Sequence, residues 1–156
     1  MDVGTGLQLN IDWLYMLRSG KAFAAGTAQA ASVGNLTEIQ LFNPVASGVT
    51  IIVHRILMSR PTQGDLEVRS HNAALATLVN VGRNLAFFGT AGKGELRTAT
   101  PVAADGTILW NVTLLADTVY PWTAEWFAVM DPGEGIHTVP GTANLINRAS
   151  FDWVEI

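Results

Sequence analysis

The stretch EIQLFNPVASGVTIIVHRILMSR, residues 38–60, decides the fold of this chain. Ile39 and Leu41 alternate with polar neighbours, which is the period of a half-buried strand. Val49–Met58 is almost continuously apolar and rich in β-branched residues, which is typical of a central strand covered on both faces. Between them lies the turn Asn43–Gly48, in which Pro44 fixes its own φ and Gly48 accepts positive φ. We therefore expect a β-hairpin in the core.

The rest of the chain repeats this alternation of short strands and turns. Gly, Pro and Asp mark turns at Arg60–Gly64, Ala104–Gly106 and Asp131–Gly135. The segment Asn72–Val81 is ambiguous between a helical turn and a strand. Alternation predicts strands at Asp65–Ser70, Glu95–Thr100, Ile108–Leu114, Trp122–Met130, Ile136–Val139 and Arg148–Glu155. Turns about every 8–12 residues are typical of an antiparallel β-sandwich or barrel, so we predict an all-β fold. The side chains expected in its core are Ile51, Val53, Ile108, Trp110, Val112, Trp126, Phe151 and Trp153.

The first 34 residues differ from this pattern, and we divide the chain into an N-terminal arm, residues 1–34, and a β-sandwich domain, residues 35–156. Ile11–Leu17 favours a short helix that ends before Gly20, with a strand as the alternative. The small residues that follow have too little bulk for a core layer, so we expect an extended arm that fastens the protein to a neighbour. The candidate interface residues are Ile11, Trp13, Leu14, Tyr15, Leu17, Phe23 and Trp122.

The composition indicates a protein that works in an assembly. Charged residues make up 14% of the chain, against about 25% in ordinary globular proteins. We expect part of this charge-poor surface to be covered by further copies, as in a homo-oligomer. The net charge of −4 and the scattered basic residues argue against nucleic acid as a partner. No signal peptide is expected, because the N-terminal sequence MDVGTG has neither a basic n-region nor an apolar h-region. No membrane partner is expected, because no apolar run reaches about 18 residues.

Residues that could carry chemistry do not form a motif. His54, His71 and His137 lie far apart in sequence, without the spacing of metal ligands. The loop Gly89–Gly94 lacks the glycine spacing and the hydroxyl residue of a phosphate-binding loop. The chain has no cysteine, which excludes thiol catalysis and disulfides. Turn formation explains carboxylates such as Asp105 and Asp131, while Glu134 and Asp152 also lie near strand ends. We therefore expect no catalytic residue, no cofactor and no metal.

A run of small residues, the segment EIQLFNPVASGV, the turn PGEGI and the closing strand FDWVEI follow one another along residues 20–156. In this order they resemble a group of small tailed-phage virion proteins. The resemblance implies a jelly-roll-like β-sandwich that decorates a capsid or belongs to a tail fibre. It rests on structural motifs, so it carries over no functional residue.

The leading functional hypothesis is a non-enzymatic virion protein that assembles in the host cytoplasm. It would be a capsid decoration (cement) protein, a homotrimer that stabilises the head by binding across subunits of the major capsid protein or other virion proteins. The alternative is a tail fibre or spike component that binds a host surface glycan through aromatic side chains such as Trp13 and Trp122.

Overall fold

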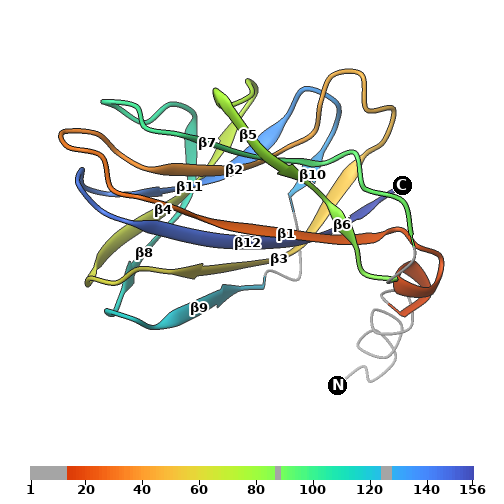
Figure 1. Ribbon diagram of the computed structural model, residues 1–156, viewed down its shortest axis with the longest axis horizontal. Coiled ribbons are helices and arrows are strands. Elements are labelled where there is room, and N and C mark those ends of the chain that lie inside the picture. The colour runs from red at the N-terminus through yellow and green to blue at the C-terminus, as the bar shows by residue number, and fades with distance from the viewer. Residues whose placement is uncertain (1–13, 87–88, 124–127) are drawn as a thin grey trace.

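The computed structural model describes residues 14–86, 89–123 and 128–156. They form two antiparallel β-sheets packed face to face (Figure 1). The predicted all-β sandwich is confirmed. A short helix over residues 14–18 precedes the first strand. No helix within these described ranges has the length and hydropathy needed to cross a membrane.

The first sheet has the strand order β10-β3-β12-β1-β6, and β9 pairs with β3 beside β10. Its strands are β1 (Ala22–Gln29), β3 (Ile51–Ser59), β6 (Arg83–Asn84), β9 (Val119–Trp122), β10 (Val129–Met130) and β12 (Asn147–Glu155). The second sheet has the order β5-β7-β2-β11-β4-β8. Its strands are β2 (Glu38–Phe42), β4 (Gly64–His71), β5 (Thr77–Val81), β7 (Glu95–Ala99), β8 (Thr107–Leu114) and β11 (Gly135–Pro140). The ambiguous segment before Val81 is thus a strand, β5.

The expected hairpin at residues 38–60 is wrong, because its strands belong to different sheets. β2 pairs with β7 and β11, whereas β3 pairs with β12, β9 and β10. The connection crosses the thickness of the sandwich, and Asn43 holds it by donating to the carbonyls of Val49 at 2.8 Å and Met130 at 2.9 Å. Two apolar strand faces joined by a turn can meet across a core as well as within a sheet.

The expectation that the small residues before Gly34 build no layer is wrong for Ala22–Gln29. This segment is β1, paired along its whole length with β12. A strand of small residues suits this place because a Cβ on Gly26 would lie 2.8 Å from the Cβ of Ser150. The division of the chain at residue 34 therefore does not coincide with the start of the sandwich.

The short helix expected near residues 10–19 is present in the described part of that segment, residues 14–18. It ends as the sequence indicates, with Gly20 at φ +71°. The Gly20 amide donates to the carbonyl of Leu17 and the Lys21 amide to that of Met16, which is the Schellman pattern. Ile11 and Trp13 lie outside the described residues.

The core confirms half of the expected set and corrects the rest. Ile51, Val53, Phe151 and Trp153 are fully buried. Ile108 is 50% exposed, so its expected burial is wrong, and Trp110 and Val112 are only partly buried. The reason is that they belong to β8, the outermost strand of its sheet, where a register shift leaves Leu109 unpaired with β4. Trp126 lies outside the described residues.

Candidate functional site

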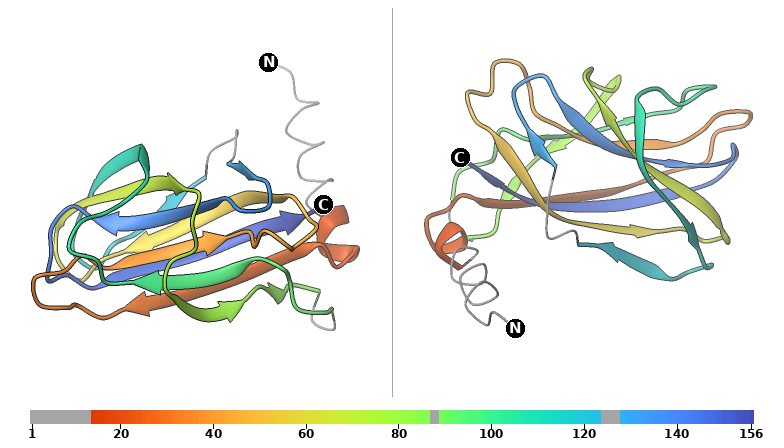
Figure 2. Two further views of the ribbon diagram at one scale, coloured as in Figure 1. Left: turned by 90° about the horizontal axis from the view of Figure 1, so that it is seen from above. Right: turned by 180° about the vertical axis from the view of Figure 1, so that it is seen from behind.

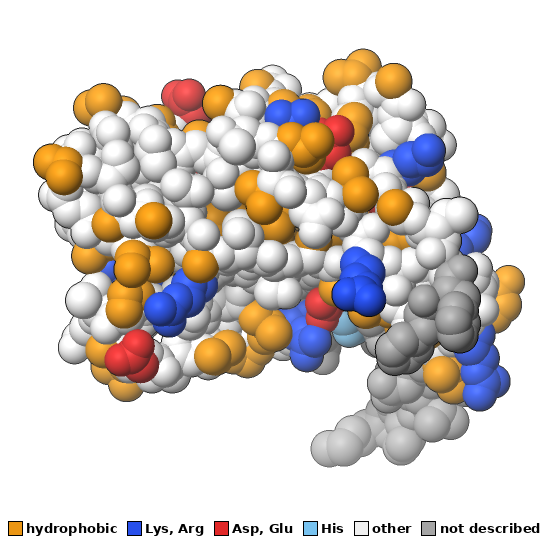
Figure 3. Space-filling view, in the orientation of Figure 1, with side chains coloured by type: hydrophobic (Ala, Val, Ile, Leu, Met, Phe, Trp, Pro, Cys, Tyr) orange, Lys and Arg blue, Asp and Glu red, His pale blue; other side chains and the backbone are white. Residues whose placement is uncertain are grey.

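One long side of the sandwich is the candidate interaction surface, and we call it the β8–β9 rim. β8 edges the second sheet there, and β9 and β10 edge the first (Figure 1). The rim carries large apolar side chains that are about half exposed or more: Ile108, Leu109, Leu115, Val119 and Val129. Figure 3 shows hydrophobic side chains at the lower left of the molecule, where β8 and β9 lie. Apolar side chains gathered in this way mark interaction sites more often than scattered ones do.

The rim is almost free of charge. Asp117 is the only charged residue between Gly106 and Thr123. Within the described part of the chain, β8 is paired on one side only, with β4. Proteins usually protect such an edge with lysine, proline or a bulge. β9 has Pro121 and β8 has a register shift, but β8 contains neither proline nor a charged residue.

Three aromatic side chains close the gap between the sheets at this rim. Trp110 of β8 stacks on Trp122 of β9 with ring centroids 6.1 Å apart, and Tyr120 lies 5.4 Å from Trp110. All three are partly exposed. The sequence singled out Trp122 as an interface or sugar-stacking residue, and the structure places it within this cluster. The cluster adds partly exposed aromatic surface to the rim.

The other candidate interface residues within the described ranges, Leu14, Tyr15, Leu17 and Phe23, do not lie on the rim. Leu14 and Tyr15 are exposed on the short helix, which lies at the opposite end of the sandwich from the β8–β9 connection (Figures 1 and 2). Leu17 is partly buried there. Phe23 is 5% exposed and stacks against Trp153 at 6.1 Å, so it belongs to the core and offers no surface to a partner.

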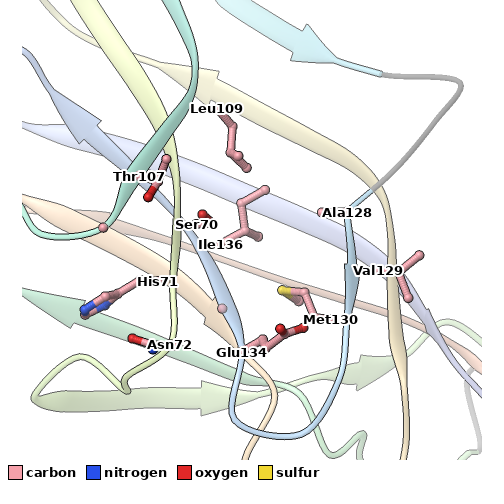
Figure 4. A pocket seen from close by; sticks show the side chains of 12 residues that line it. Ser70, His71, Asn72, Thr107, Leu109, Ala128, Val129, Met130, Glu134 and Ile136 are labelled. Carbon is pink, nitrogen blue, oxygen red and sulfur yellow. The ribbon is translucent and has the colours of Figure 1, made fainter.

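A pocket of about 390 Å³ opens next to the rim, between the ends of β4 and β8 and the turn that joins β10 to β11. Figure 4 shows Leu109, Met130 and Ile136 around this space, while the His71 ring points to the other side of β4. The carboxylate of Glu134 accepts the Asp131 amide at 2.8 Å and so serves the turn. The lining is mixed, with polar residues such as Ser70 and Thr107 beside apolar ones such as Leu109, which suits a partner that presents both kinds of group.

Two of the three histidines meet on the outer face of the second sheet. His71 and His137 have ring centroids 5.5 Å apart, and Nε2 of His137 lies 3.8 Å from Oε1 of Glu38. His54 belongs to β3 in the other sheet. Among the described residues, no group of three His, Cys, Asp or Glu side chains could hold a metal ion.

The pKa values of this cluster are displaced in opposite directions. Burial raises the pKa of Glu38 to about 7, Asp105 adds to the effect and Arg69 opposes it. Burial lowers the pKa of His137 to about 4, with further contributions from His71 and Arg69 and an opposing one from the Asp105 backbone. A displaced pKa in a cluster often marks function, but structural clusters show it too.

The remaining candidate groups have structural partners. Asp152 binds the Arg55 guanidinium at 2.5 Å. In the loop that resembles a phosphate site, the amides of Lys93 and Gly94 donate to the Glu155 carboxylate at 2.8 and 2.9 Å. That carboxylate occupies the place an anion would take, which agrees with the expectation of a structural loop.

No family model, curated protein or solved structure matches this chain. Its function is therefore argued from the rim and from the sequence resemblance. Sequence reasoning missed Leu109, Leu115, Val119 and Val129 as rim residues. The signal that could have found most of them is the nearly charge-free run from Gly106 to Thr123.

Proposed function

We propose that this protein is a non-enzymatic structural subunit that binds other subunits through the β8–β9 rim. In its specific form the proposal is a virion capsid decoration protein that stabilises the head by binding across capsid subunits. The observation that carries the proposal is the rim itself, an edge with exposed apolar side chains on which β8, β9 and the turn between them contain one charged residue, Asp117. The resemblance to small tailed-phage virion proteins supports its placement in a virion.

The physical basis of the proposed adhesion is burial and strand pairing. Apolar surface removed from water contributes roughly 25 cal/mol per Å², and a partner that binds only the folded, assembled state stabilises it by mass action. The outward backbone groups of β8 can also accept a further strand. A contact of this kind needs no catalytic residue.

A homotrimer fits the two exposed edges of the second sheet. A ring of three copies needs two different surfaces on each copy, because its interfaces are heterologous. β5 edges the same sheet opposite to β8, and its Leu78, Val79 and Val81 are exposed. We propose that the rim of one copy meets the β5 edge of the next.

The second candidate function is glycan binding in a tail fibre or spike. The aromatic cluster of Trp110, Tyr120 and Trp122 favours it, because partly exposed rings can stack on a sugar. Binding to a glycan array that is lost in Trp122→Ala would support this function over the first.

Introducing a positive charge into the rim is expected to weaken self-association. In Ile108→Lys and Val119→Lys, assembly would have to desolvate an ammonium group, so we expect association to fall by about 100-fold or more. Sedimentation velocity over a range of protein concentrations measures the change.

The matched control is Val102→Lys, a substitution at an exposed valine in the loop between β7 and β8. It adds the same charge and should leave association unchanged. Wild-type protein that is monomeric at all concentrations, or rim variants that associate as well as the control, would contradict self-association through the rim. Circular dichroism shows whether each variant is folded.

A further inference from the structure

The outer face of the second sheet contains a buried acid–base pair that the proposed function does not use. Glu38 on β2 and His137 on the neighbouring β11 are 2% and 0% exposed. In the described part of the chain, no hydrogen bond of standard geometry reaches Oε1 of Glu38 or either ring nitrogen of His137, although the Asp105 backbone lies close enough to His137 to act on its pKa. Buried polar groups are normally paired, so this arrangement needs an explanation.

The loop of residues 72–76 covers part of this face, and side chains of the sheet hold it there. Gln40 donates to the carbonyl of Ala73 at 2.9 Å and accepts the amide of Leu75 at 2.8 Å. Arg97 on β7 donates to the carbonyl of Leu75 at 2.9 Å. These bonds fix the loop against the sheet and bury Leu75.

The loop before β8 lies against the same face. Nη1 of Arg69 lies 3.2–3.4 Å from the carbonyls of Ala104, Asp105 and Gly106. A Cβ on Gly106 would lie 3.2 Å from Cε1 of His137, so the backbone of this loop reaches the imidazole ring. The loop therefore helps to shield the His137 ring from solvent.

Most of the charged side chains around Glu38 and His137 form ion pairs with other residues. On β4, Arg69 pairs with Glu67 at 2.6 Å, and the ring of His71 faces His137. On β7, Arg97 pairs with Glu95 at 2.6 Å. The loop before β8 contributes Asp105, and residues 72–76 contain no titratable side chain. On this buried face Glu38 and His137 lie 3.8 Å apart, and Arg69 acts electrostatically on both groups.

We propose that Glu38 and His137 form a proton-compensating pair that keeps the stability of the fold insensitive to mild acid. In the folded protein the pair holds one proton, which resides on the Glu38 carboxyl, and the imidazole is neutral. Unfolding releases the Glu38 proton to water and lets His137 take one up, so the net exchange of protons is small.

The sign of each contribution follows from the pKa values. The Glu38 pKa rises from 4.5 to about 7 on folding, so its contribution is full at low pH and is lost as the pH rises from 4.5 to 7. The His137 pKa falls from 6.5 to about 4, so its contribution is full at high pH and is lost as the pH falls from 6.5 to 4. Between pH 4.5 and 6.5 the two slopes cancel.

Single substitutions should therefore reveal opposite pH dependences. Relative to wild type, the folding equilibrium constant of Glu38→Gln should rise on the order of 30-fold from pH 4.5 to 6.5, because only the histidine linkage remains. That of His137→Asn should fall by a similar factor. The double variant should follow the wild-type profile. Urea unfolding at several pH values measures all four proteins.

An NMR titration of the wild-type protein tests the same proposal without a substitution. The His137 ring should stay neutral down to about pH 4, and the Glu38 carboxyl carbon should titrate near pH 7. Single variants that follow the wild-type profile, or a His137 ring that is charged at pH 6, would overturn the proposal. If a single variant does not fold, the two titrations in the wild-type protein decide it.

Discussion

Truncation of Trp153 to alanine is expected to lower the free energy of unfolding by about 3–5 kcal/mol. The side chain is fully buried and stacks against Phe23. Gly82 and Gly94 pack their backbones against the indole, where a Cβ would overlap the ring or touch it. Backbone cannot move in to fill the space as a flexible side chain could, so the cavity should persist.

Urea denaturation measures this effect. Tyr15→Ala is the control, because this aromatic side chain is 66% exposed and its loss should change the free energy of unfolding by about 0.5 kcal/mol or less. If Trp153→Ala were as stable as Tyr15→Ala, the indole would not hold the end of the sandwich together.

Replacement of Glu155 by alanine is expected to cost about 3 kcal/mol or more of unfolding free energy, because hydrogen bonds to a charged group contribute about 1.5–3 kcal/mol. The buried carboxylate accepts the amides of Lys93 and Gly94 and, at 3.0 Å, the indole Nε1 of Trp153. Alanine would leave these donors without their acceptor. The carboxylate thus links the last strand to the loop before β7 and to the core.

The matched control for this change is Glu134→Ala. Its carboxylate also accepts a backbone amide, that of Asp131, but it lies on an exposed turn. We expect a loss of about 1 kcal/mol or less there. Thermal unfolding compares the two variants, and amide exchange at Gly94 reports the local effect. Equal losses in both would show that the buried carboxylate has no special role.

Local features of the fold were readable from the sequence. The strands at Asp65–Ser70 and Arg148–Glu155 alternate apolar and polar residues, and the helix before Gly20 ends with a glycine at positive φ. These signals depend on neighbouring residues alone. The assignment of β2 and β3 to different sheets could not be read, because it depends on pairing with β11 and β12, which are distant in sequence.

The same distinction applies to the sites. Alternation places Ile108 on an apolar face but cannot reveal that its strand is an edge, so its expected burial was wrong. Glu38 and His137 occupy the polar positions of their strands and look solvent-facing in the sequence. The loop of residues 72–76 and the loop before β8 bury them. The alternation of polar and apolar residues within a strand cannot predict burial by loops that are distant in sequence.

Hydrogen exchange along the rim tests the central claim most directly. At low protein concentration, the amides of β8 that do not pair with β4 should exchange freely. At high concentration, strand pairing or burial should protect residues 107–114 and 119–122, together with the β5 edge, while the exposed amides of Val45 and Ala46 in the turn between β2 and β3 stay unchanged as an internal reference. Exchange on β8 and β9 that is independent of concentration, in a protein that nevertheless assembles, would contradict the rim as its interaction surface.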